Sequence, residues 1–157
     1  MVNLYNCPTK LGQITIAEER DAIIALYFPG EPIPPGASMQ ETPLLKRASE
    51  QLIGYLAGEL KAFKLPLAPQ GTDFMRLVWE QLQKIPYGET RSYKQIAESV
   101  GSPRASRAVG QANHRNPIPI FIPCHRVIGS SGKLVGYGGG LPIKMFLLEI
   151  EKITTQT

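Results

Sequence analysis

The segment Pro-Ile-Pro-Ile-Phe-Ile-Pro-Cys-His-Arg-Val-Ile, residues 117–128, restricts the fold of the second half of the chain. It is apolar, carries three prolines, and ends on a cysteine that lies between a proline and a histidine. Because proline lacks a backbone N–H and disfavours helical geometry in the residue before it, neither a helix nor a central strand fits. The segment therefore predicts a stiff, extended, buried ribbon that delivers Cys124 and His125 to a fixed place.

The composition is that of an ordinary globular protein. Of 157 residues, 43% are hydrophobic and 19% are charged, which is typical of a protein with its own core. No apolar run approaches the roughly 20 residues that span a bilayer, and the N-terminal residues lack a signal-peptide pattern. We therefore expect a cytoplasmic protein with no membrane contact, in which Cys7 and Cys124 both remain thiols.

The positive charge is concentrated in the second half of the chain. Residues 1–70 carry six Lys/Arg and seven Asp/Glu, a balance of −1, whereas residues 71–157 carry eleven and six, a balance of +5. This asymmetry favours a polyanionic partner for the second half. A solvated basic surface with no partner is the alternative that charge alone leaves open.

The first half predicts a small sheet with one helix. Apolar and aromatic alternation indicates short strands, and helical spacing of leucines indicates the helix. The expected strands are 2–7, 12–17, 22–28 and one further at 62–67; residues 29–38 are expected as a loop and 42–58 as the helix. Pro66, Pro69 and Gly71 then indicate a boundary, where the charge balance also changes.

The second half predicts helices, two of them short and joined by a tight turn. A helix is expected from Thr72 to about Ile85, and Ser92-Tyr-Lys-Gln95 is a capping box that opens the next. Ser102-Pro103 is expected to start a third, with serine as its cap, and Pro142 the last. A basic second helix after a glycine-containing turn is the outline of a helix-turn-helix, although an ordinary helical hairpin has the same pattern.

Cys124 is the candidate nucleophile, because a thiolate beside a base can attack an electrophile. In an extended segment adjacent side chains point apart, so direct contact with His125 requires a turn or a bridging water. Glu149 and Glu151 are both candidates to orient the imidazole. A buried structural thiol and a cysteine hydrolase remain alternatives. A zinc site is less favoured, since the chain has only two cysteines and two histidines.

The second half resembles the O6-alkylguanine-DNA alkyltransferase family. Ile-Pro-Cys-His-Arg-Val at 122–127 carries the resemblance most strongly, and seven further motifs follow the family's order. They are Gly-Thr-Asp-Phe (71–74), Ile-Pro-Tyr-Gly-Glu-Thr (85–90), Ser-Tyr-Lys-Gln-Ile-Ala (92–97), Ser-Arg-Ala-Val-Gly (106–110), Asn-Pro-Ile (116–118), Gly-Tyr-Gly-Gly-Gly (136–140) and Leu-Leu-Glu-Ile-Glu (147–151). The first half matches the family only in outline.

The resemblance implies an α/β (α+β) fold in two domains. Residues 1–68 would form a small ribonuclease H-like sheet-plus-helix domain. Residues 69–157 would form a mainly helical DNA-binding and alkyl-transfer domain with a winged-helix-like helix-turn-helix. Some relatives hold a structural zinc with four N-terminal Cys/His ligands, but this chain has only Cys7 there. The resemblance thus implies no metal, no cofactor and, by expectation, a monomer.

The implied activity is a single, irreversible transfer of the alkyl group from O6 of guanine to Cys124. In the family a histidine acts as base through a water and is held by a glutamate on the last helix; these are His125 and Glu151 here. Asn116 resembles the hinge asparagine, and Tyr137 the tyrosine that binds the flipped guanine. Val127 and Gly138 would line the pocket with Tyr137; many relatives have serine in place of Gly138, which suggests tolerance of bulkier alkyl groups.

The implied partner is double-stranded DNA containing O6-alkylguanine, bound through the minor groove with low sequence specificity. The target base must leave the stack. Arg107 would replace it, Tyr93 would help rotate its phosphate, and Arg126 is a further expected DNA contact. The small residues that would let the recognition helix approach the groove are Ala105, Ala108, Gly110 and Ala112. Non-enzymatic relatives carry tryptophan in place of the nucleophile, so DNA binding without transfer is the second hypothesis.

Overall fold

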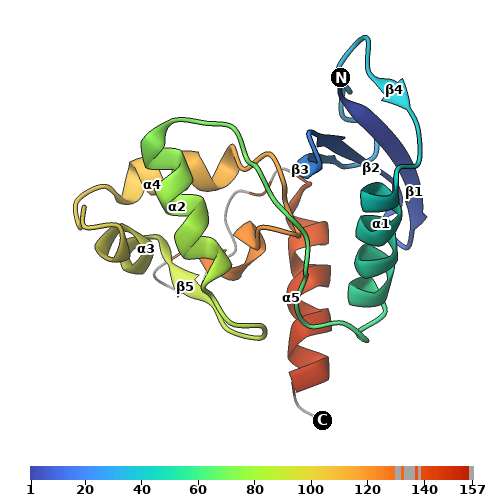
Figure 1. Cartoon of the computed structure of the whole chain (residues 1–157). Coiled ribbons are helices and arrows are strands. Elements are labelled where there is room, and N and C mark those ends of the chain that lie inside the picture. The colour runs from blue at the N-terminus through green and yellow to red at the C-terminus, as the bar shows by residue number, and fades with distance from the viewer. Residues whose placement is uncertain (130–131, 133–136, 138, 156–157) are drawn as a thin grey trace. The chain divides into compact units, whose positions relative to one another are not determined.

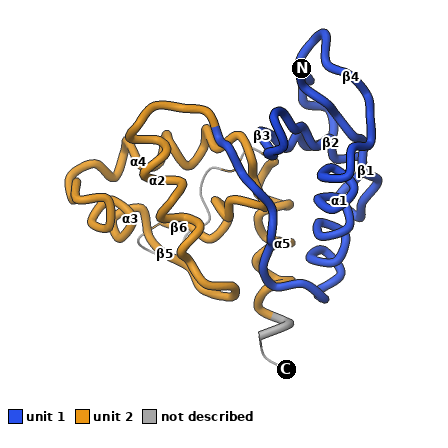
Figure 2. Tube along the Cα trace, viewed as in Figure 1, with its two compact units in different colours: residues 1–69 blue, residues 70–157 orange. Residues whose placement is uncertain are grey.

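The computed structural model describes residues 1–129, 132, 137 and 139–155. Its chain divides into two compact units, Met1–Pro69 and Gln70–Thr157 (Figure 2); a boundary was expected at 68/69. The first unit combines a sheet with one helix, and the second is mainly helical (Figure 1). The mixed α/β fold class predicted from the sequence is confirmed. Among the described residues, no helix has the length and apolar character needed to span a membrane.

The sheet of the first unit has the strand order β3-β2-β1-β4 (Figure 1). Its strands are β1 (Asn3–Thr9), β2 (Gly12–Glu19), β3 (Ala22–Tyr27) and β4 (Ser38–Met39). The first three form an antiparallel meander, and Arg20 and Asp21, both with positive φ, turn β2 into β3. Two adjacent positive φ angles are typical of the type I′ hairpin turn, whose twist matches that of the strands.

Strand β4 lies at the end of the proline-rich stretch that was expected to be only a loop. It pairs in parallel with β1, where Ser38 N–H donates to the Val2 carbonyl at 2.9 Å and Gln40 N–H to Leu4 at 2.9 Å. The strand expected at 62–67 is absent from the sheet; only Leu67 bridges to Ile23. Pro66 offers its carbonyl to Ile23 but has no N–H to continue a ladder.

Helix α1 (Pro43–Leu56) packs on the sheet and completes the core of the first unit. Thr42 caps it by accepting from Leu45 N–H at 3.2 Å, and Pro43 occupies the first turn, where its missing N–H removes no helical bond. The buried face of the helix consists of Leu44, Leu45, Ala48, Ser49, Leu52, Tyr55 and Leu56. A helical period of apolar residues thus determines which face meets the sheet.

The second unit is built on four helices of the described chain. They are α2 (Asp73–Gln83), α3 (Tyr93–Ser99), α4 (Ser106–His114) and α5 (Leu141–Thr155). Trp79 of α2 is almost fully buried, and its indole N–H donates to the Ala112 carbonyl of α4 at 2.8 Å. Gly71 lies beneath the same ring, where an added Cβ would approach an indole carbon to 2.5 Å. These contacts hold α4 in place.

The helix-turn-helix consists of α3 and α4, and one predicted helix start is wrong. The capping box is present, with Gln95 N–H donating to Ser92 Oγ at 3.1 Å and Ser92 N–H to Gln95 Oε1 at 2.9 Å. Helix α4, however, starts at Ser106 and not at Ser102-Pro103. Ser102 instead opens a turn, closed by Ala105 N–H to the Ser102 carbonyl at 2.9 Å. The fixed φ of proline suits the second position of a turn as well as the first turn of a helix.

The proline-rich segment is buried from residue 118 to residue 127, but it is not extended. Ile122 N–H donates to the Ile118 carbonyl at 2.9 Å, and Phe121 N–H to the Pro119 carbonyl at 2.9 Å. The second bond closes a γ-turn around Ile120, whose φ is 73°. A positive φ at a β-branched residue is strained, so the surrounding core enforces a compact loop where a ribbon was expected.

A 3₁₀ turn, η1 (Cys124–Arg126), follows directly. Arg126 N–H donates to the Pro123 carbonyl at 3.0 Å, and Val127–Ile128 (β6) then pairs in parallel with Arg91–Ser92 (β5). The strand pair joins the end of η1 to the residues that open α3. The nucleophile candidate is therefore fixed to the helix-turn-helix through the backbone.

Candidate active site

Cys124 is buried, with 4% of its surface exposed. Its N–H donates to the Ile122 carbonyl at 2.7 Å, and its own carbonyl accepts from Asn113 Nδ2 at 3.3 Å. Burial raises the pKa of the Cys124 thiol to about 11, although hydrogen bonds from Asn116 and Tyr137 and the charge of Lys144 act in the opposite direction. The resting thiol is thus protonated near neutral pH and needs a base to become a nucleophile.

Asn116 braces the loop that precedes Cys124. Its Nδ2 donates to the Ile122 carbonyl at 2.9 Å, and its Oδ1 accepts from Ile118 N–H at 3.0 Å. One side chain therefore bonds both ends of the five-residue turn from Ile118 to Ile122. This geometry suits the hinge role that the resemblance implies for Asn116.

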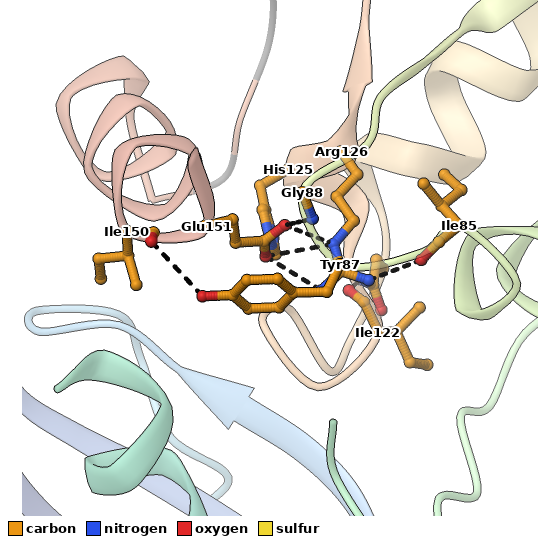
Figure 3. A network of polar contacts seen from close by, with 9 residues as sticks. Ile85, Tyr87, Gly88, Ile122, His125, Arg126, Ile150 and Glu151 are labelled. Carbon is orange, nitrogen blue, oxygen red and sulfur yellow. Dashed lines mark hydrogen bonds and ion pairs between the residues drawn. The ribbon is translucent and has the colours of Figure 1, made fainter. Parts of the chain in front are cut away.

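His125 lies against Glu151 of α5 (Figure 3). Both side chains are buried, and the imidazole Nε2 is 2.7 Å from the carboxylate Oε2. Glu149, the other sequence candidate, is exposed. The structure thus places Glu151, and not Glu149, on the histidine.

The Glu151 carboxylate has two further partners (Figure 3). Arg126 donates from Nε at 2.9 and 3.2 Å to the two oxygens and from Nη2 at 3.0 Å, and Gly88 N–H donates to Oε1 at 3.0 Å. Burial alone would raise the pKa of Glu151, but its bonds to His125 and Arg126 lower it to about 2. The carboxylate is therefore ionised at any pH near neutral.

The ionised carboxylate determines the tautomer of His125. Burial lowers the pKa of His125, so the imidazole is neutral at neutral pH. A neutral imidazole has one N–H, and Nε2 must carry it to donate to an ionised Glu151. Nδ1 then carries the lone pair and is the nitrogen that can act as a base.

Lys144 and Tyr137 complete the surroundings of Cys124. Lys144 of α5 is fully buried, donates from Nζ to the Val127 carbonyl at 2.7 Å, and lies close enough to favour a thiolate. Tyr137 is also buried and hydrogen-bonds toward Cys124. Gly138, expected in the same pocket, lies outside the described residues. Val127 is buried, and its role in the pocket stays a prediction.

The residues expected to meet DNA cluster on α4 and the start of α3. Arg107 and Ala108 are exposed, and Ala105 and Gly110 are partly exposed. Tyr93 opens α3 and packs near Gly110, where a Cβ would lie 3.9 Å from its ring. The pKa of Tyr93 is raised by its burial and by the nearby Cys124.

Arg126 does not fit the role of a DNA contact that was expected for it. Only 8% of it is exposed, and its guanidinium is bonded to Glu151 and, from Nη1 at 2.7 Å, to the Ile85 carbonyl. The resemblance implied a DNA contact for Arg126, but the 3₁₀ turn directs its side chain to Glu151 and to the Ile85 carbonyl. Four residues bond to the site in ways that the sequence did not predict: Arg126, Lys144, Gly88 and Asn113.

A helix-turn-helix unit with a buried cysteine, a histidine and an ionised glutamate defines a class: DNA-binding proteins that can use their own thiol as a nucleophile. Two family models match the chain. The DNA-binding domain of 6-O-methylguanine DNA methyltransferase matches residues 73–153, and its ribonuclease-like domain matches residues 2–69. The chain belongs to the 6-O-methylguanine DNA methyltransferase family.

Similar proteins cover the whole chain. The constitutive methylated-DNA–protein-cysteine methyltransferase of Bacillus subtilis (strain 168) is 52% identical over 161 residues, which is 98% of each chain. Among solved structures, the O6-methylguanine methyltransferase of Mycobacterium tuberculosis has a TM-score of 0.90 at 44% identity, over 98% of this chain and 94% of its own. The OGT of the same species in complex with DNA has a TM-score of 0.88 at 44% identity, over 98% and 93%.

Proposed function

We propose that this chain repairs DNA by moving an alkyl group from O6 of guanine to Cys124, where it stays as a thioether. Family membership over both units supports this function, and so do the DNA complex and the methyltransferase names of close relatives. The observation that carries it here is the buried Cys124 with the His125–Glu151 pair beside it. A thioether does not hydrolyse under mild conditions, so each molecule acts once.

The transfer is a displacement at the alkyl carbon. The Cys124 proton passes to His125 Nδ1 through a bridging water, the sulfur–carbon bond forms, and the carbon–O6 bond breaks with its electron pair left on guanine. Tyr137 donates a proton to the departing base and is reprotonated from solvent, to which His125 releases the proton that it took from the thiol. The net result is one proton moved from thiol to guanine and one alkyl group moved to sulfur. Lys144 stabilises the developing thiolate by its charge.

The substrate must be flipped out of the duplex before the thiol can reach it. Arg107 is exposed on α4 and fits the role of filling the gap left in the stack. The small residues Ala108 and Gly110 on the same helix suit close approach to the minor groove, where low sequence specificity follows from the degenerate pattern of base edges. We propose that the monomer performs these steps.

The proposal is tested by weighing the intact protein after incubation with a duplex carrying O6-methylguanine. A gain of one methylene in the wild type, absent in Cys124→Ser, is the expected result. If the mass does not change while the protein still binds the duplex, the chain is a binding module and the proposal is wrong. Cys7→Ser, which removes the other buried thiol, should still gain the methylene and serves as the matched control.

Arg107→Ala should separate base flipping from chemistry. Because unstacking a base costs a few kcal/mol, we expect transfer from duplex DNA to slow by about ten-fold or more. Transfer from free O6-benzylguanine, which needs no flipping, should be unchanged. Single-turnover rates with both substrates measure this, and Arg104→Ala, which removes another exposed charge from the preceding turn, is the control. Equal slowing on both substrates contradicts the role given to Arg107.

A further inference from the structure

Arg126 is not one of the three residues Cys124, His125 and Glu151, yet each of its three guanidinium nitrogens donates a hydrogen bond. Its Nε and Nη2 both donate to Glu151, and its Nη1 donates to the Ile85 carbonyl. The Tyr87 ring lies alongside, 5.7 Å from the guanidinium carbon. The side chain is buried, so these bonds are shielded from water and its charge is only weakly screened. Figure 3 shows the contacts together.

These contacts fix the orientation of the Glu151 carboxylate. Oε1 accepts from Gly88 N–H, and Oε2 accepts from Arg126 Nη2 and meets His125 Nε2. A guanidinium fork binds a carboxylate in its own plane, so rotation of the Glu151 side chain would break its bonds to Arg126 Nε and Nη2. The oxygen that faces His125 is thereby kept in position.

We propose that Arg126 is a positioning residue of the transfer reaction: its guanidinium fork holds Glu151 in the orientation that receives the His125 Nε2 hydrogen, so that Nδ1 is the base toward Cys124. This inference rests on the proposed alkyl transfer. It assigns Arg126 to the proton relay and not to the DNA contacts. Arg126 touches neither the thiol nor the substrate in this role and acts only through Glu151.

The role has a geometric part and an electrostatic part. The charged or titratable groups that face His125 are Glu151 and Lys144 of α5, Arg126, and the adjacent Cys124. Burial lowers the pKa of His125, Glu151 opposes this, and the charges of Arg126 and Lys144 add to the lowering. Loss of the Arg126 charge should therefore raise the pKa of His125. Loss of the forked guanidinium with the charge kept should leave that pKa unchanged.

Two substitutions separate these parts. Arg126→Lys keeps the charge but has no fork, and Arg126→Gln removes the charge. With saturating O6-methylguanine duplex, we expect the plateau single-turnover rate of Arg126→Lys to fall about ten- to a hundred-fold, with the midpoint of the acid limb unchanged. For Arg126→Gln we expect a similar fall and a midpoint moved to higher pH, because the rate requires neutral His125.

Controls distinguish the possible failures. Arg76→Gln removes an exposed charge of α2 and should keep the wild-type profile. DNA affinity, measured by fluorescence anisotropy, should be unchanged in both Arg126 variants; a loss of affinity at an unchanged plateau rate makes Arg126 a DNA contact and overturns the inference. A wild-type plateau in Arg126→Lys also overturns it. Absence of transfer in the wild type refutes the proposed function itself.

A spectroscopic measurement covers the case in which Arg126→Gln does not fold. The chain has two histidines, His114 and His125, so ¹⁵N spectra of the ring nitrogens are readily assigned with a His114→Gln variant. We expect the wild type to show the Nε2-protonated tautomer at His125, and Arg126→Lys to show a mixture of tautomers. The same single tautomer in both proteins would mean that Glu151 needs no help from Arg126, and the inference fails.

Discussion

Glu151→Gln should nearly abolish alkyl transfer and also destabilise the protein. The amide presents either an oxygen or an N–H to His125, so the Nε2 tautomer is no longer enforced. His125 then no longer consistently offers Nδ1 as the base, and loss of general-base catalysis lowers rates by about a hundred-fold or more. Arg126 would also be left as a buried charge without its partner, which lowers the free energy of unfolding by about 3–5 kcal/mol. Single-turnover kinetics and urea denaturation measure the two effects.

Glu149→Gln is the matched control, because it removes the same charge from the same helix at an exposed position. We expect wild-type transfer and a free energy of unfolding within about 0.5 kcal/mol of wild type. If both glutamine variants behave alike, the relay assigned to Glu151 is wrong.

Acid conditions provide a second measure of Glu151. Its pKa in the folded protein is lowered to about 2, below the roughly 4.3 of an unfolded glutamate. The carboxylate therefore contributes stability that is complete above the unfolded value and is lost as the pH falls toward 2. The free energy of unfolding of Glu151→Gln should fall less steeply with acid in that window. An identical acid slope in the two proteins contradicts the buried ionised carboxylate.

Cys124 should remain a protonated thiol until strongly alkaline pH. With a pKa of about 11, roughly one thiol in ten thousand is ionised at pH 7. Thiolate ultraviolet absorbance should therefore be absent through pH 9 and rise only near pH 11, and iodoacetamide should react slowly at neutral pH. The measurement uses Cys7→Ser, so that Cys124 is the one remaining cysteine, with circular dichroism to monitor folding.

A thiolate already present at pH 7 would contradict this prediction and would indicate a Cys124–His125 ion pair in the resting protein. The predicted result has a mechanistic consequence. Since burial keeps the thiol neutral and His125 also neutral, the nucleophile forms only as its proton leaves during the transfer. A buried, neutral thiol is also protected from adventitious oxidation, which requires thiolate character.

Local sequence signals predicted most of the elements. Thr72 and Ser92 each accept a bond from a backbone N–H at the start of a helix, as their positions before apolar periodic segments indicated. Thr42 caps the expected helix of the first unit in the same way, although only the helix and not its cap was predicted. Such caps depend on residues three or four apart, so sequence alone reveals them. Ser102-Pro103 was misassigned because the same dipeptide suits a turn, and the choice depends on how α4 packs.

Motif order was sufficient to identify the family, and family membership covers both units. The identity of the nucleophile, its histidine and its last-helix glutamate came with that resemblance. The geometry of Cys124, His125 and Glu151 in the structure agrees with it, while their roles remain to be tested by the experiments above.

The amino-acid sequence alone was enough for the helices with caps, the meander of strands, the family and the candidate nucleophile, because each is encoded by neighbouring residues or an ordered set of short motifs. Tertiary structure alone decided the compact loop around Ile120, the bonds that join Glu151 to His125 and Arg126, and the inward course of Arg126. These depend on partners 25 and 26 residues away in sequence for Arg126 and His125 and on a core that enforces a positive φ. Long-range packing selects among locally equivalent conformations, and no local pattern records that selection.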